Sequence, residues 1–88
     1  MPIEVTVEKR GSNPFRYALR LSQPVDQQRL MALIMWGDLR RWGVDGIEGR
    51  DSARTLAFNS TMDLSDAELE SLLAEFGKRT GYEFQLAA

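Results

Sequence analysis

The chain has 88 residues, a formal net charge of -2, and neither cysteine nor histidine. Its length predicts a single domain over residues 1–88, because two cores of half that size would each be too small to be stable. The composition excludes disulfides, thiolate nucleophiles and cysteine-based metal sites, and it removes the imidazole that most often acts as metal ligand or neutral-pH acid–base group.

Residues 3–21 alternate between apolar and polar side chains, with one interruption by a Gly-Ser-Asn-Pro turn. This pattern predicts a β-hairpin of two strands that each bury one face. The register is predicted from charge: pairing Glu8 with Arg16 and Glu4 with Arg20 places opposite charges across the strands. We favour this interpretation of Arg16 and Arg20 as cross-strand partners of glutamates. The alternative interpretation is that they form a basic anchor for phosphate.

A first helix is expected from Pro24, which suits the first helical turn, to about Trp42, with Gly43 ending it. One apolar stripe at helical spacing would pack on the sheet; it consists of Leu30, Leu33, Ile34 and Gly37.

The same helix carries a second apolar stripe, turned about 130° from the first on a helical wheel. Methionine, tryptophan and arginine are enriched at protein interfaces, so we predict a partner-binding surface here. Its residues are Met31, Met35, Trp36, Leu39, Arg40, Arg41 and Trp42. The competing interpretation, which we weigh equally, is that the second stripe packs under the following loop or against the second helix.

The glycine-punctuated loop 43–51 has three carboxylates, at Asp45, Glu48 and Asp51. They are too sparse for a calcium loop, and the glycines follow a helix instead of leading into one, as a phosphate cradle requires. We expect a short strand at 45–48, then a turn, then a strand at 53–58. A small-ligand or metal site at this loop is kept as an alternative.

The second helix has clear start and stop signals. Ser65 and Glu68 form a capping box, Leu64 and Leu69 a hydrophobic staple, and Gly81 suits the C′ position. Its buried stripe is predicted to be Leu69, Leu72, Leu73 and Phe76, and a last strand with alternating residues follows over 82–86.

These elements predict an α+β fold: a mostly antiparallel sheet of four to five strands with two helices on one face. After the first strand, the order βαββαβ is that of ferredoxin-like folds, here with an extra N-terminal strand. In such a sheet the last strand takes the free side of the first core strand. The N-terminal hairpin competes for that place, so one of the two must lie elsewhere.

The function predicted from these features is a small, non-enzymatic protein-binding module of inhibitor or adaptor type, with no cofactor and no metal. Its partner would be another protein or a second copy of the chain. The first alternative is a nucleic-acid-associated module using Arg29, Arg40 and Arg41, although the acidic net charge and the lack of outward-facing aromatic residues on the strands disfavour it. With no signal peptide and no apolar run near the ~20 residues of a membrane span, we expect a cytoplasmic protein without membrane contact.

Overall fold

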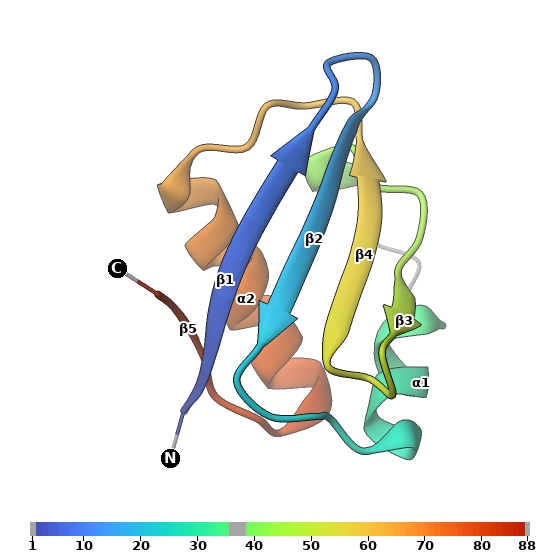
Figure 1. Cartoon of the computed structure of the whole chain (residues 1–88), viewed down its shortest axis with the longest axis vertical. Helices are drawn as coiled ribbons and strands as arrows, with labels where there is room; N and C mark the ends of the chain where they lie inside the picture. Colours follow the sequence, from blue (N-terminus) through green and yellow to red (C-terminus); the bar gives the residue numbers. More distant parts are fainter. Residues whose placement is uncertain (1, 36–38, 88) are drawn as a thin grey trace.

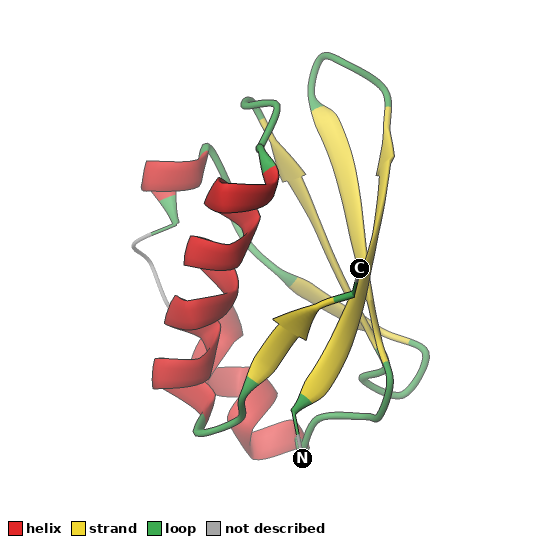
Figure 2. Cartoon of the chain, turned by 90° about the vertical axis from the view of Figure 1, so that its left-hand side faces the viewer, coloured by secondary structure: helices red, strands yellow, loops and turns green. Residues whose placement is uncertain are grey.

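The computed structural model describes residues 2–35 and 39–87. Five strands form one sheet in the order β3-β4-β2-β1-β5, and the helices cover one of its faces (Figure 2). The elements along the chain are β1 (Ile3–Arg10), β2 (Phe15–Leu21), α1 (Gln27–Ile34), a 3₁₀ turn η1 (Arg40–Trp42), β3 (Glu48–Arg50), β4 (Thr55–Ser60), α2 (Asp66–Thr80) and β5 (Phe84–Leu86). The predicted α+β class, with five strands and two helices, is confirmed.

The competition between the N-terminal hairpin and the last strand is resolved in favour of the hairpin (Figure 1). β2, β4 and β3 have the neighbours that a ferredoxin-like core requires, and all pair antiparallel. β1 occupies the free side of β2, and β5 is displaced outward, where it pairs parallel with β1. The hairpin takes the inner place because a short turn brings β1 beside β2 at a smaller entropic cost than a connection through a whole helix.

The hairpin register differs by two residues from the charge-based prediction. Val7 pairs with Leu19 and Arg10 pairs with Arg16, so each strand keeps its buried face but exchanges its partners. The predicted register would place Pro14 in the ladder, and proline has no N–H to donate. Charge did not predict the register, because Glu8 can also pair with a diagonal neighbour; it pairs with Arg20 although it lies opposite Ala18.

Two segments are displaced from their predicted positions. α1 begins only at Gln27, after the N-cap Asp26, because the backbone N–H of Val25 is bonded to the carbonyl of Ala53. Strands β3 and β4 lie about two residues further along the chain than expected. The turn between them places Asp51, Ser52 and Ala53 in the left-handed region, with φ of 53°, 56° and 66°.

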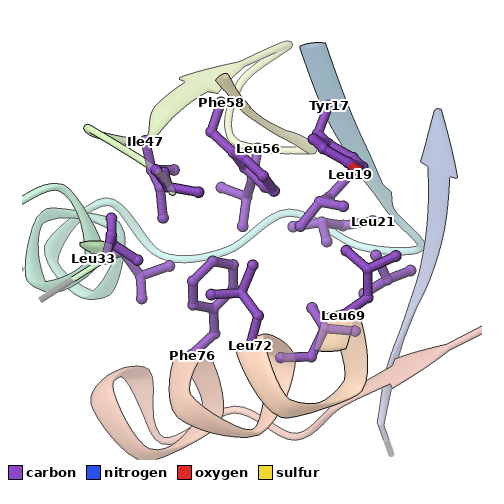
Figure 3. Close-up of a cluster of buried hydrophobic side chains, with 14 of the residues drawn as sticks. Tyr17, Leu19, Leu21, Leu33, Ile47, Leu56, Phe58, Leu69, Leu72 and Phe76 are labelled. Atoms are coloured by element: carbon purple, nitrogen blue, oxygen red, sulfur yellow. The ribbon is translucent and has the colours of Figure 1, made fainter. Parts of the chain in front are cut away.

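The second helix forms as predicted. Ser65 and Glu68 make a reciprocal capping box, and Gly81 adopts the left-handed conformation that ends the helix. Its buried residues include the predicted stripe, Leu69, Leu72, Leu73 and Phe76. Figure 3 shows Leu72 and Phe76 pointing toward the leucines of the sheet, with Leu33 of α1 reaching the same core from the side.

Candidate functional site

The second apolar stripe predicted for the first helix is divided by the structure. Leu39 and Trp42 are 2% and 3% exposed and belong to the core, so the prediction that they lie on a partner-binding surface is wrong. The helix ends at Ile34, and helical spacing therefore does not relate Met31 to Leu39 or Trp42. The turn η1 directs Trp42 inward, where its carbonyl accepts a hydrogen bond from the Ser60 hydroxyl at 2.6 Å.

Among the described residues, the other members of the predicted surface are exposed. Met31 is 49% and Met35 78% exposed. Arg40 and Arg41 are also exposed, and the Arg41 guanidinium lies 5.4 Å from the centre of the Trp42 ring. Trp36 and Gly37, and the side chain of Ile34, lie outside the described residues. We call Met31 and Met35 the α1 surface.

Arg29, named in the nucleic-acid alternative, has a structural role. Its guanidinium donates a hydrogen bond to the carbonyl of Thr80 and lies 5.2 Å from the centre of the Tyr82 ring. These contacts fasten α1 to the end of α2. Of the predicted set, Arg40 and Arg41 remain on the surface, with Arg41 lying against the Trp42 ring.

A second surface, which the sequence did not indicate, is the face of the sheet without helices. It is hollowed into a groove of about 750 Å³ that crosses β1, β2, β4 and β3. The floor is formed by small side chains of the two central strands, Ala18, Thr55 and Ala57. Thr55 and Ala57 point outward as predicted but are buried, because the longer side chains of neighbouring strands rise around them. The sequence prediction missed this groove because the groove depends on the strand registers, which decide which side chains lie beside one another.

Four arginines and three carboxylates line this sheet groove. Arg20 pairs with Glu8 at 3.0 Å, and Arg50 pairs with Glu48 at 3.1 Å. Asp51, at one end, accepts a hydrogen bond from the Thr55 hydroxyl at 3.1 Å. The groove thus also receives residues from the loop 43–51 that was considered as a ligand site.

Arg10 and Arg16 lie at the other end of the groove, directly opposite each other on β1 and β2. Asn59 of β4 continues the same row beside Arg16. Within residues 2–35 and 39–87, neither guanidinium has an ion pair or a hydrogen bond. This end of the groove therefore carries two arginines without ion pairs of their own, because Glu8, in the next row opposite Ala18, pairs with Arg20.

The structure does not form the metal site considered for the loop 43–51. In the described part of the chain, no group of three or more acidic side chains is placed to hold a metal ion, so Asp45, Glu48 and Asp51 do not form a metal centre. No described helix is both long and apolar enough to cross a membrane. At the far side of the sheet, Lys9 donates to the Asp63 carboxylate at 2.6 Å, and this hydrogen bond raises the pKa of Lys9.

No protein family model matches the chain, and comparisons with curated proteins and with solved structures found no match.

Proposed function

We propose that the protein is a small, non-enzymatic module that binds another protein through the α1 surface, as an inhibitor or adaptor does. The observation that carries this proposal is the exposure of Met31 on α1 and of Met35 at its C-cap. Among the described residues, the only other large apolar side chain classed as exposed is Met62. Arg40 and Arg41, on the turn that follows α1, provide charged groups beyond it.

A partner at the α1 surface could bury apolar side chains that the fold leaves in solvent. Placing one methionine side chain in an apolar environment contributes ~1.5–3 kcal/mol, and the fold leaves most of the Met35 side chain in solvent. Methionine also adapts its shape to irregular partner surfaces, because its side chain is unbranched and polarizable. A partner that covers both methionines would gain this burial without rearrangement of the core.

Leu39 and Trp42 no longer contribute to the proposed surface, which is therefore smaller than the sequence predicted. The nucleic-acid alternative is weaker for a similar reason, since Arg29 is engaged by Thr80 and Tyr82. Two remaining arginines in a chain of net charge -2 provide little of the phosphate neutralisation that such binding needs.

The test uses a photo-crosslinking amino acid placed at position 35 in the full chain, in host lysate, with position 62 as the matched control. We expect position 35 to form a crosslink to one protein that position 62 does not. Light scattering of the purified chain decides whether that protein is a second copy. A Met35→Glu variant should lose the crosslinked partner when the probe is placed at position 31, and Met62→Glu should retain it.

The proposal predicts that Met35→Glu leaves the free energy of unfolding within ~0.5 kcal/mol, as substitutions at exposed sites do. Identical crosslinking from positions 35 and 62, or retention of the partner by Met35→Glu, would contradict the α1 surface as the binding site.

A further inference from the structure

The paired arginines at the hairpin end of the sheet groove cost the fold stability. Like charges directly opposite each other on neighbouring strands are destabilising, and Arg10 and Arg16 are in this position. A register shifted by two residues would place Glu8 opposite Arg16. In the observed register Glu8 pairs with Arg20 instead, and Arg16 is left with a second arginine.

The charge at this end fits one kind of ligand. Side chains directly opposite each other on a sheet have Cβ atoms about 5 Å apart, so both guanidinium groups can reach one anion. Arginine binds carboxylate and phosphate through two parallel hydrogen bonds. A carboxylate or a phosphate diester neutralises one positive charge, whereas a phosphate monoester carries a charge of about -1.5 to -2 near pH 7 and matches the pair.

The rest of the groove indicates which group a bound phosphate monoester would carry. Its volume, about 750 Å³, lies within the ~300–1,000 Å³ typical of small-molecule sites. Beyond the arginines the floor is low, because Ala18 and Ala57 have the smallest side chains that a strand can carry outward. Glu48 lies directly across from Ala57, and Asp51 lies further along the groove, bonded to Thr55; both carboxylates line the groove and can accept hydrogen bonds from hydroxyl groups.

We propose that the sheet groove binds a sugar phosphate. Arg10 and Arg16 hold the phosphate, with Asn59 beside them, and the sugar lies over Ala18 and Ala57 with hydroxyl groups directed toward Glu48 and Asp51. Outward-facing residues of the described strands include no aromatic side chain on which a base could stack, so a sugar phosphate fits better than a nucleotide. The site lies on the face of the sheet opposite the helices and is independent of the α1 surface.

The experiment is an NMR titration of the full chain at low ionic strength with ribose 5-phosphate, ribose and inorganic phosphate. We expect ribose 5-phosphate to shift the backbone amides of Arg10, Arg16, Ala18 and Ala57, and to bind more tightly than inorganic phosphate. Ribose alone should shift none of them. Equal affinity for ribose 5-phosphate and inorganic phosphate would overturn the sugar part of the proposal, and tighter binding of a phosphoserine peptide would overturn the small-molecule assignment.

Variants separate the arginine pair from a general charge effect. Hydrogen bonds to charged groups contribute ~1.5–3 kcal/mol, so Arg16→Gln should weaken ribose 5-phosphate binding at least about tenfold. The matched control is Arg54→Gln, which removes the same charge from an exposed position outside the groove lining and should change affinity less than about twofold, since an unpaired surface charge acts only through a screened field.

A stability measurement on the same variants provides a second readout. Arg16→Gln removes the repulsion with Arg10, and its thermal midpoint should therefore be equal to or above that of the wild type. A lower midpoint would show that the arginine pair has a structural role instead, and equal weakening of binding by Arg16→Gln and Arg54→Gln would overturn the site.

Discussion

The division of the first helix's second stripe can be tested by one pair of substitutions, Leu39→Ala and Met35→Ala. On a continuous helix these two side chains would lie one turn apart on the same face and would have similar surroundings. In the structure Leu39 is fully enclosed by the core, whereas Met35 is mostly in solvent. The two variants should therefore differ strongly in their free energy of unfolding.

The expected magnitudes follow from burial. Truncating a buried leucine to alanine costs ~2–5 kcal/mol, because the transfer free energy is lost and a cavity remains. We expect about 3 kcal/mol for Leu39→Ala and less than ~0.5 kcal/mol for Met35→Ala, which is an exposed site. A domain of this length has a total stability of about 4–13 kcal/mol at ~0.05–0.15 kcal/mol per residue, so the first change removes a large share of it.

The assay is urea unfolding followed by circular dichroism, with a common slope fitted to the wild type and both variants. The midpoint of Leu39→Ala should fall well below that of Met35→Ala, and its thermal midpoint should be lower by ~10 °C or more. Equal midpoints for the two variants would refute the argument, because they would show that Leu39 and Met35 share one environment. The predicted continuous helix would then be the better description of this segment.

Three further predictions concern single contacts. Ser65→Ala removes the side-chain oxygen that accepts from the backbone N–H of Glu68 at 3.2 Å, and it should lower the free energy of unfolding by about 1 kcal/mol. Gly43→Ala should cost more than the ~1–2 kcal/mol of a left-handed alanine, because φ is 67° and a Cβ would lie 2.5 Å from Oγ1 of Thr61. The pKa of Lys9 is raised by its contact with Asp63, so this contact stabilises the fold while Lys9 is protonated. The stabilisation is complete below the unfolded pKa of about 10.4 and is lost as the pH rises through the higher pKa of the folded state.

Each of these has a direct check. Urea melts measure the first two, and adding Thr61→Ala to Gly43→Ala should restore part of the loss; no restoration would show that the clash with Thr61 is not the cause. For the third, the difference in free energy of unfolding between wild type and Lys9→Met should shrink between pH 9 and pH 12. A constant difference would show that the contact with Asp63 does not depend on the charge of Lys9.

The second helix shows what sequence alone determined. Its cap, its buried stripe and its last residue depend on contacts three or four positions apart, between residues such as Ser65 and Glu68. Such contacts form within the segment itself, and their spacing is visible in the sequence. The same holds for which face of each strand is buried, since alternation has a period of two and a slip by two residues leaves it unchanged.

Tertiary structure decided the features on which function depends. Three features depend on contacts between segments that are distant in the chain: the order of β1 and β5, the hairpin register, and the burial of Leu39 and Trp42. Several such arrangements are compatible with the same local sequence pattern. The α1 surface and the sheet groove are both consequences of those choices. The absence of histidine and cysteine excluded familiar chemistry from the beginning, but only the folded sheet brought Arg10 and Arg16 together, because their proximity comes from strand pairing and not from spacing along the chain.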